Sequence, residues 1–121
     1  TYFATEILET GEFIGFIGLA YQDYACEFTP ATDIGWRLKK NAWGKGYATE
    51  GAKACLEFGF KNLNLDRIIS IFTEKNIKSE QVMKKIGMNR VGTFNHPKLK
   101  EYPNYERCIC YEIKNSGRDS K

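Results

Sequence analysis

The sequence predicts a single domain of mixed α/β class, with one sheet and two helices. Its 121 residues fit one domain, and a composition that is 42% hydrophobic and 14% aromatic is typical of a chain with a packed core. The apolar residues alternate at first, take a helical spacing after Gly46, and then return to strand patterns. We expect residues 1–114 to form the domain and residues 115–121 to form a flexible tail.

Three strands are predicted before the first helix. β-branched and aromatic residues over Tyr2–Leu8 and Phe13–Tyr21 indicate two strands, and Thr10-Gly11-Glu12 between them is typical of a hairpin turn. A loop is expected over residues 23–32, and a third strand over Asp33–Leu38, where apolar side chains alternate toward one face. The hairpin predicts that the first two strands are antiparallel.

A helix of about four turns is predicted to begin near Gly46, because apolar residues then recur in steps of three and four. Asn62 and Asn64 supply turn residues for its end, and Arg67–Thr73 is apolar on both faces, as in a buried parallel strand. This strand and Asp33–Leu38 should be parallel neighbours, since strand–helix–strand crossovers are right-handed and parallel. The apolar positions of the helix are Ala48, Ala52, Cys55, Leu56, Phe60 and Leu63.

A second helix is predicted over Ile77–Ile86, with Asn76 as its N-cap and Gly87 as the residue after its C-cap. Asn89–Phe94 and Arg107–Ile113 are expected to be the last two strands. The element order is therefore β-β-β-α-β-α-β-β, which gives a mixed sheet with helices packed on its faces.

Composition argues against several classes of protein. Lys and Arg number 18 against 15 Asp and Glu, and this small excess is too slight for a dedicated nucleic-acid binder but suits a small polyanionic ligand. No apolar run approaches the ~20 residues of a membrane span, and the start of the chain lacks the layout of a signal peptide. We therefore expect no membrane and no nucleic-acid partner.

The cysteines predict thiols rather than a metal site. The sequence contains no Cys-x-x-Cys, and its one histidine, His96, is distant from the cysteines, so we expect no bound metal. Cys108 and Cys110 should share one face of a strand. Reduced thiols used as small apolar residues predict a cytoplasmic protein.

The loop before the first helix has the features of an anion site. Gly44 and Gly46 remove side chains close to the helix start, where unpaired N–H groups and the helix dipole attract negative charge. Lys39, Lys40 and Lys45 add positive charge, as a pyrophosphate would require. The loop lacks the spacing of a P-loop and the third glycine of a dinucleotide-binding fingerprint. By itself, it is also compatible with a tight turn that carries solvated lysines.

The surrounding motifs resemble the GNAT superfamily of N-acetyltransferases. Residues 41–46 read Asn-Ala-Trp-Gly-Lys-Gly, similar to the pyrophosphate loop Gln/Arg-x-x-Gly-x-Gly/Ala of that family, although Asn41 replaces Gln or Arg. The similarity extends from Glu12 to Lys114. It is greatest to the branch that acetylates ribosomal-protein N-termini, in Gly35-Trp-Arg-Leu38, Trp43-Gly-Lys-Gly-Tyr-Ala-Thr-Glu50, Asn76-x-x-Ser79 and Met83-Lys-Lys-Ile-Gly-Met88.

This resemblance implies a GNAT-like, mostly antiparallel sheet with a central parallel strand pair and flanking helices. It also implies that a strand and two helices usual before the first hairpin are missing. The implied activity is transfer of the acetyl group from acetyl-CoA to a primary amine, by direct attack and without a metal. The acceptor would be a ribosomal or other protein N-terminus, or a small-molecule amine. The resemblance further suggests a homodimer.

The resemblance also assigns residues to the coenzyme. Trp36, Arg37 and Leu38 would bind pantetheine through their backbone, although Trp36 and Leu38 also fit a core role. Asn76 would bind a pantetheine amide, or act only as an N-cap. The pyrophosphate loop comprises Trp43, Gly44, Lys45, Gly46, Tyr47, Ala48 and Thr49.

The catalytic assignments are fewer. Ser79 is the candidate that protonates the departing thiolate, or it simply bonds the helix backbone. Many family members carry a Tyr donor where this chain has Met83, which cannot donate a proton. The candidate general bases are Glu12, Asp23, Glu27, Asp33 and His96, and the residues that could flank the acceptor are Tyr102, Tyr105 and Tyr111.

Two other functions fit the same sequence. The chain could be a non-catalytic acyl-CoA-binding module whose acceptor half is absent. A nucleotide- or RNA-binding α/β domain could use the same basic loop, although the sequence lacks the aromatic pattern typical of RNA readers.

Overall fold

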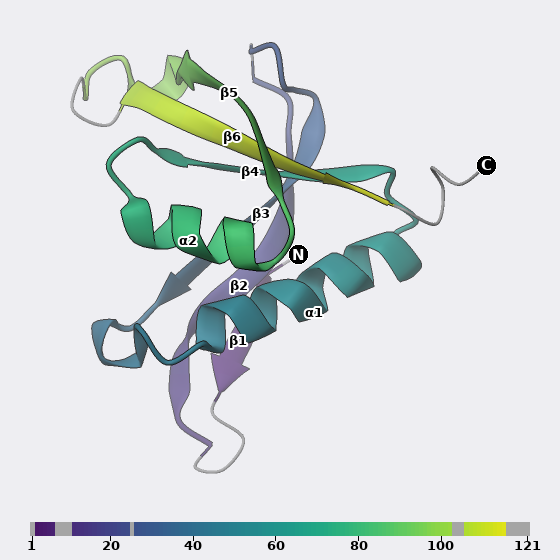
Figure 1. The fold of residues 1–121 in the computed structure, drawn as a ribbon, viewed down its shortest axis with the longest axis vertical. Helices are drawn as coiled ribbons and strands as arrows, with labels where there is room; N and C mark the ends of the chain where they lie inside the picture. The colour runs from purple at the N-terminus through teal and green to yellow at the C-terminus, as the bar shows by residue number, and fades with distance from the viewer. Residues whose placement is uncertain (1, 7–10, 25, 103–105, 116–121) are drawn as a thin grey trace.

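The computed structural model describes residues 2–6, 11–24, 26–102 and 106–115, with side chains from residue 11 onward, and forms one sheet with two helices (Figure 1). The helices are α1 (Tyr47–Lys61) and α2 (Ile77–Lys85), and two short 3₁₀ turns cover Lys40–Ala42 and Pro97–Leu99. The strands are β1 (Tyr2–Glu6), β2 (Phe13–Gln22), β3 (Ala31–Leu38), β4 (Arg67–Thr73), β5 (Asn89–Asn95) and β6 (Arg107–Lys114).

The predicted element order is confirmed, with small shifts at the boundaries. Strand β3 begins at Ala31, two residues before the predicted start, and α2 ends at Lys85, one residue before the predicted end. Leu8, the predicted end of the first strand, and Thr10, the first residue of the predicted turn, lie outside the described residues, as does the tail from residue 116.

The six strands lie in the order β1-β2-β3-β4-β6-β5. Every neighbouring pair is antiparallel except β3 and β4, which are parallel, with Asp33 opposite Ile69. The mostly antiparallel sheet with a central parallel pair is thus confirmed. This pair is joined by α1, as the spacing of the apolar residues predicted.

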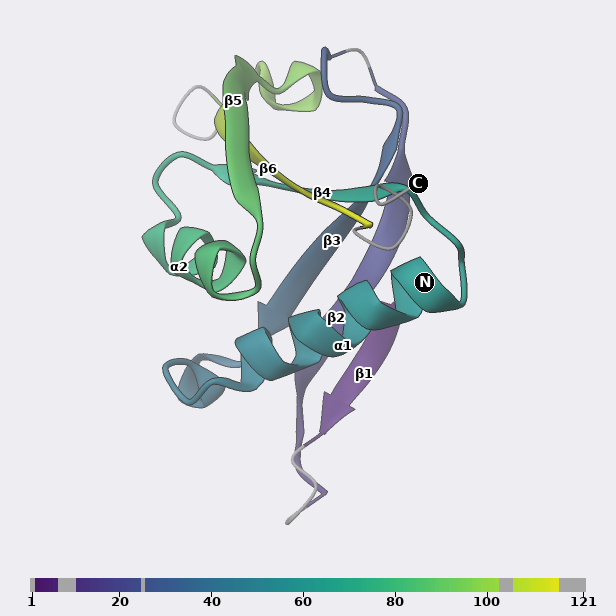
Figure 2. The ribbon, with the colours of Figure 1, turned by 45° about the vertical axis from the view of Figure 1, so that its right-hand side comes forward.

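Both helices cover the same face of the sheet (Figures 1 and 2). They share one core with the strand residues that point to that face, among them Ile34, Ile68 and Ile109. The two helical crossovers proceed in the same direction across the sheet, and right-handed crossovers then place both helices on one side. The two faces of the sheet are therefore covered differently.

Loops cover part of the opposite face. A second core contains Ile69, Phe94, Cys108 and Cys110, and side chains packed against it include those of Tyr24, Cys26, Phe28 and Leu99. The predicted placement of Cys108 and Cys110 on one strand face is confirmed. All four cysteines are thiols.

The helix ends explain where the chain turns. Gly46 adopts a left-handed conformation, φ 82°, immediately before α1, and Asn64 adopts φ 56° just after it. Asn76 caps α2, because its side-chain Oδ1 accepts a hydrogen bond from the Ser79 N–H at 3.1 Å. Gly87 follows α2 with φ 90°, as predicted for a residue after a C-cap. Within the described part of the chain, neither helix has the length and apolar character needed to cross a bilayer.

Candidate functional site

Strands β3 and β4 diverge beyond their single registered pair. Near this point, the buried Ser70 hydroxyl donates a hydrogen bond to the Ile34 carbonyl at 2.9 Å, which joins the two strands through a side chain. Strand β3 continues to pair with β2 as far as Leu38. The last residues of β3 therefore present backbone groups that have no ladder partner in β4.

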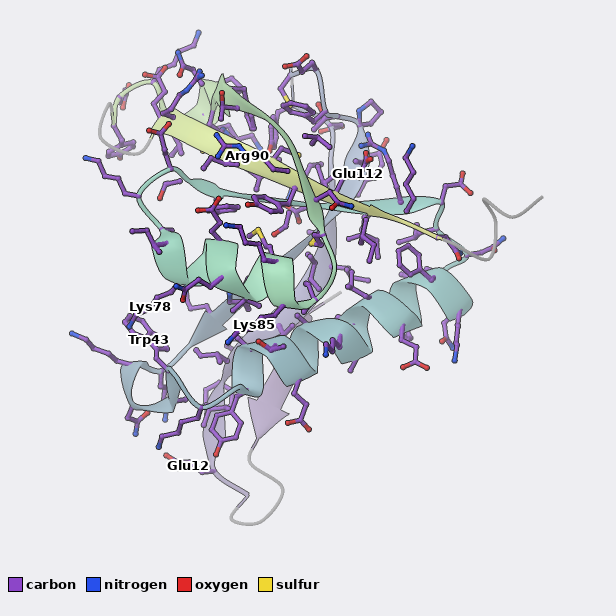
Figure 3. All side chains as sticks on the ribbon, in the orientation of Figure 1. Glu12, Trp43, Lys78, Lys85, Arg90 and Glu112 are labelled. Atoms are coloured by element: carbon purple, nitrogen blue, oxygen red, sulfur yellow. The ribbon has the colours of Figure 1, made fainter. Side chains whose placement is uncertain are left out.

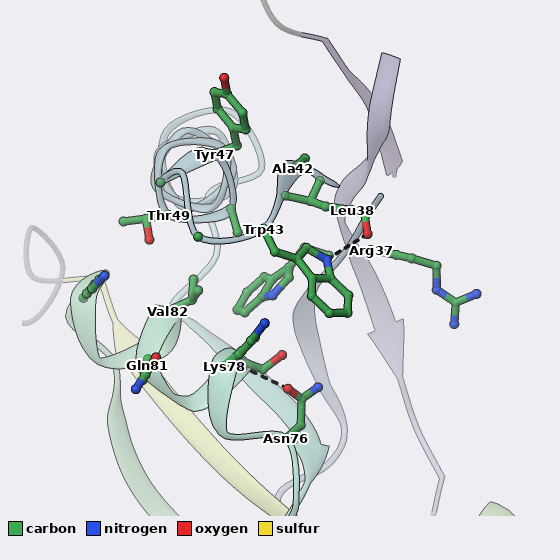
Figure 4. Close-up of a pocket in the computed structure, with 16 residues that line it drawn as sticks. Arg37, Leu38, Ala42, Trp43, Tyr47, Thr49, Asn76, Lys78, Gln81 and Val82 are labelled. Carbon is green, nitrogen blue, oxygen red and sulfur yellow. Dashed lines mark hydrogen bonds between the residues drawn. The ribbon is translucent and has the colours of Figure 1, made fainter. Parts of the chain in front are cut away.

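A cleft of about 400 Å³ lies beside these backbone groups (Figure 4). It is bounded by the end of β3, the loop before α1, the first turn of α1 and the exposed side of α2. All the residues assigned to the coenzyme from the sequence line this cleft except Lys45, and Ser79 lines it as well. Segments from residues 36 to 79 thus meet at one place.

The side chains in this set do not all point inward. Those of Arg37 and Tyr47 point away from the cleft in Figure 4, so these residues border it mainly through their backbone. The Trp36 and Leu38 side chains belong to the core between sheet and helices. The prediction that the Trp36 and Leu38 side chains have a core role is therefore confirmed. It is compatible with a role for their backbone in the cleft.

The loop before α1 keeps the helix start open. Gly44 and Gly46 have φ of 74° and 82°, and a Cβ on either would meet no atom within 4 Å. The helical hydrogen bonds begin with the one from the Glu50 N–H to the Gly46 carbonyl, so the N–H groups of residues 47–49 precede the helical ladder. Unpaired N–H groups and the positive end of the helix dipole favour an anion here.

Trp43 joins three walls of the cleft. Its indole Nε1 donates a hydrogen bond to the Leu38 carbonyl at 3.0 Å, and the Lys78 ammonium lies 4.4 Å from its ring centroid (Figures 3 and 4). The contact with the ring is a cation–π interaction. Trp43 therefore connects the loop to β3 on one side and to α2 on the other.

The cleft also contains residues that the sequence interpretation missed. Four of them share one side of α2, where spacings of three and four bring side chains together. This spacing, next to the predicted Asn76, was the signal that could have identified them. The missed residues are Lys78, Gln81, Val82 and Lys85, together with Ala42 in the loop before α1.

The electrostatics of the cleft favour an anion. The ammonium groups of Lys78 and Lys85 border it, and none of the described residues that line it is acidic. A concave surface with charge of one sign raises the local concentration of oppositely charged ligands. The cleft thus suits an elongated polyanion with an apolar portion.

The Asn76 side chain both caps α2 and lines the cleft. Its Oδ1 caps α2, and among the described residues no acceptor takes a hydrogen bond from its Nδ2. The side chain also lines the cleft, so the amide donor is available to a bound molecule. Met83, by contrast, is buried in the core, with 1% of its surface exposed.

Most of the other catalytic candidates lie elsewhere. Glu12, Asp23 and Glu27 are exposed and do not line the cleft. Tyr111 is buried, and its hydroxyl donates a hydrogen bond to the Glu80 carboxylate at 2.8 Å. Tyr102 is exposed, and Tyr105 lies outside the described residues.

Asp33 and His96 lie together on the opposite face of the sheet. Both line a second cavity there, of about 220 Å³. Of the carboxylates considered from the sequence, Asp33 is therefore the one that the described structure places in a cavity.

Comparison with known proteins identifies the family. Residues 1–89 match the model of the acetyltransferase (GNAT) domain. An uncharacterized N-acetyltransferase, YnaD, of Bacillus subtilis is 55% identical over 62 residues, which are 51% of this chain and 36% of the relative. The chain spans between about a third and a half of the length of the curated relatives it matches.

Solved structures agree with this match. A GNAT-family acetyltransferase from Bacillus anthracis is 34% identical, with a TM-score of 0.75 over 93% of this chain and 65% of that one. A ribosomal-protein-S5-alanine acetyltransferase from Vibrio fischeri shares the fold at 24% identity, with a TM-score of 0.74 over 94% of this chain and 61% of that one. With the family model covering most of its residues and its fold matching these structures, the chain belongs to the GNAT family of acetyltransferases.

Proposed function

We propose that residues 1–114 form an acetyltransferase domain that binds acetyl-CoA in the cleft and transfers its acetyl group to a primary amine. The observation that carries the proposal is the convergence of three features in one cleft: a strand end that has no ladder partner in β4, an open helix start and a cationic helix side. Members of the family use acetyl-CoA as co-substrate, and the shape and charge of this cleft suit that molecule.

The pyrophosphate is proposed to lie at the start of α1. The absence of side chains at Gly44 and Gly46 allows phosphate oxygens to approach the backbone N–H groups of residues 44–48. Lys78 and Lys85 then face the phosphates from α2. Lys45 does not line the cleft, so it would contribute only longer-range attraction.

Pantetheine is proposed to lie along the end of β3. Its amides can pair with the backbone groups of residues 36–38 that β4 leaves without partners. The Asn76 Nδ2 can donate to a pantetheine carbonyl from the opposite wall. A strand edge and an amide on opposite sides would hold the thioester in a fixed position, which is a large part of catalysis in a direct-transfer reaction.

In the proposed chemistry, the neutral amine nitrogen attacks the thioester carbonyl carbon. The carbon–sulfur bond breaks, the amine passes one proton to solvent water, and coenzyme A leaves as a thiolate. The thiolate takes a proton from the Ser79 hydroxyl, which regains a proton from solvent, or from a water that this hydroxyl orients. The acceptor is a protein N-terminus or a small-molecule amine. The thiol state of the cysteines supports a reducing compartment such as the cytoplasm, and the family resemblance suggests a homodimer.

The test combines binding with turnover. Calorimetry should give saturable binding of acetyl-CoA that free coenzyme A displaces and an oligonucleotide does not. Release of coenzyme A thiol should then require an added amine. Displacement by the oligonucleotide would favour a nucleic-acid-binding domain. Binding without thiol release, across a panel of amines, would favour a non-catalytic acyl-CoA-binding module.

A further inference from the structure

Trp43 spans the cleft from one wall to the other. Its indole Nε1 donates a hydrogen bond to the Leu38 carbonyl at the end of β3, at 3.0 Å. On the other side, the Lys78 ammonium of α2 lies 4.4 Å from the ring centroid (Figure 4). All three residues line the cleft, so the indole lies within the space where the coenzyme is proposed to bind.

The hydrogen bond to Leu38 takes up a backbone group with which pantetheine is proposed to pair. Successive residues of a strand point their carbonyls to opposite sides, so those of Ile34, Trp36 and Leu38 share one side of β3. The Ile34 carbonyl receives the Ser70 hydroxyl of β4 at 2.9 Å, which shows that this side faces away from β2. The indole therefore lies where a pantetheine amide would meet the Leu38 carbonyl.

Lys78 has two available partners in the cleft. In the structure its ammonium lies against the Trp43 ring, and a cation–π interaction of an exposed side chain is weak. The proposed position of the pyrophosphate offers the second partner, and a hydrogen bond from an ammonium to a phosphate is strengthened by both charges. The flexible four-carbon stem of lysine allows the change of partner. A bound pyrophosphate should therefore draw Lys78 away from the ring.

The Trp43 side chain lies outside the main core. It has 45% of its surface exposed, and it is not among the described residues that pack against that core. The next residue, Gly44, adopts φ 74°, and a Cβ there would meet no atom within 4 Å. The chain after Trp43 can thus change its backbone angles with little obstruction. Once Lys78 leaves the ring, the hydrogen bond to Leu38 is left to keep the indole in the cleft.

We infer that Trp43 and Lys78 form a latch that makes binding of the pantetheine arm depend on the pyrophosphate. The phosphates draw Lys78 off the ring, the indole leaves Leu38, and the Leu38 carbonyl becomes open to a pantetheine amide. The two residues thereby determine specificity, because they favour thioesters of coenzyme A over thioesters of pantetheine alone. The inference rests on the proposed binding of acetyl-CoA in this cleft.

Two halves of the coenzyme test the latch by calorimetry. ADP carries the pyrophosphate without pantetheine, and pantetheine is uncharged and carries no phosphate. Saturating ADP should lower the dissociation constant of pantetheine at least fivefold, and saturating pantetheine should lower that of ADP by the same factor, because coupling between two ligands is reciprocal. Without the latch, two ligands that occupy separate parts of one cleft should bind independently.

Lys78→Met removes the ammonium and keeps a long side chain. It should raise the affinity for pantetheine alone and reduce the coupling with ADP below twofold. Lost attraction to phosphate cannot explain a gain in affinity for an uncharged ligand. Lys84→Met, which changes an exposed lysine of the same helix outside the cleft, should keep the full coupling.

The indole N–H resonance of Trp43 gives a second measurement in NMR spectra, and its absence from the spectrum of Trp43→Phe identifies it. ADP alone should shift this resonance in a saturable way, because the indole loses its hydrogen bond to Leu38. Lys78→Met should shift it in the same direction before any ligand is added.

The remaining outcomes are also decisive. Coupling below twofold in the wild-type chain, or full coupling in the folded Lys78→Met variant, would overturn the latch. If that variant fails to fold, the coupling and the ADP-induced shift in the wild-type chain still decide the question. Normal binding of coenzyme A with uncoupled halves, or with no pantetheine binding even at saturating ADP, would overturn this inference alone. A chain that binds neither coenzyme A nor ADP would overturn the proposed function.

Discussion

The Trp43 indole donates its hydrogen bond to the carbonyl of Leu38, the last residue of β3, at 3.0 Å. A single side chain thus links the loop before α1 to the strand end that borders the cleft. The other tryptophan, Trp36, also lines the cleft, so both tryptophans of the sequence are in it.

Intrinsic fluorescence should therefore report ligand binding directly. Acetyl-CoA is expected to change the tryptophan emission in a saturable titration, because a bound ligand alters the surroundings of both indoles. Trp43→Phe should remove the larger part of that change, since Trp43 is the more exposed of the two. An emission spectrum unaffected by saturating acetyl-CoA would contradict the placement of the ligand in this cleft.

Gly46→Val should weaken coenzyme A binding by more than tenfold, a loss above ~1.4 kcal/mol. The added side chain would project toward the helix start, where the pyrophosphate is proposed to lie. Gly11→Val is the matched control, because Gly11 has a similar φ of 70° and equally open surroundings but lies outside the cleft. Calorimetry on both folded variants separates lost access from backbone strain. Unchanged affinity in Gly46→Val would contradict the prediction.

Asn76→Asp should preserve stability and reduce coenzyme affinity. Asp caps a helix about as well as Asn, so the melting temperature should stay nearly constant. The change removes the Nδ2 donor and adds a negative charge near a polyanionic ligand. The expected loss of affinity is on the order of 1–3 kcal/mol. A dissociation constant within twofold of wild type would assign Asn76 to capping alone.

Lys85→Met should weaken coenzyme A binding severalfold and reduce its dependence on salt, because Lys85 borders the cleft. Lys84→Met provides the control, since Lys84 is exposed on the same helix and does not line the cleft. Titrations at low and high ionic strength check the prediction. Equal effects of the two substitutions would indicate only a general change in net charge.

Asp33 should make the protein less stable as the pH rises from about 4 to about 6. Its pKa is raised from 3.8 to about 6 in the folded state, so the folded chain holds a proton over this range that the unfolded chain has lost. Stability then falls with rising pH, by at most about 3 kcal/mol for a shift of this size. Asp33→Asn should flatten this part of the profile. Chemical denaturation across the range measures it, and a wild-type profile in the variant would contradict the prediction.

The sequence predicted the turns and helix ends that border the cleft, because their determinants are local. The two glycines, the spacing within α1 and the capping Asn76 lie in or next to one crossover unit, and each follows from short-range pattern. The contributions of Lys78 and Lys85 were not predicted, because they depend on which side of α2 faces the cleft. That orientation is set by packing between α2, α1 and the sheet.

The surroundings of Asp33 could not be predicted for a similar reason. Alternation alone places its side chain on one face of β3, but its burial depends on the loops that cover that face. These loops are far apart in the sequence and carry no periodic pattern. Asp33 thus remained one of several candidate carboxylates until the fold brought Tyr24 and His96 beside it.

The unequal covering of the two sheet faces has a consequence for how such a domain can diversify. On one side, packed helices fix the cleft, and a substitution there disturbs the main core. On the other side, two loops that contain Tyr24, Phe28 and Leu99 cover part of the sheet, and loops tolerate changes of length and sequence more readily than helices do. New specificities on the loop side can therefore arise by exchange of these two loops, while the helical side and its geometry are inherited unchanged.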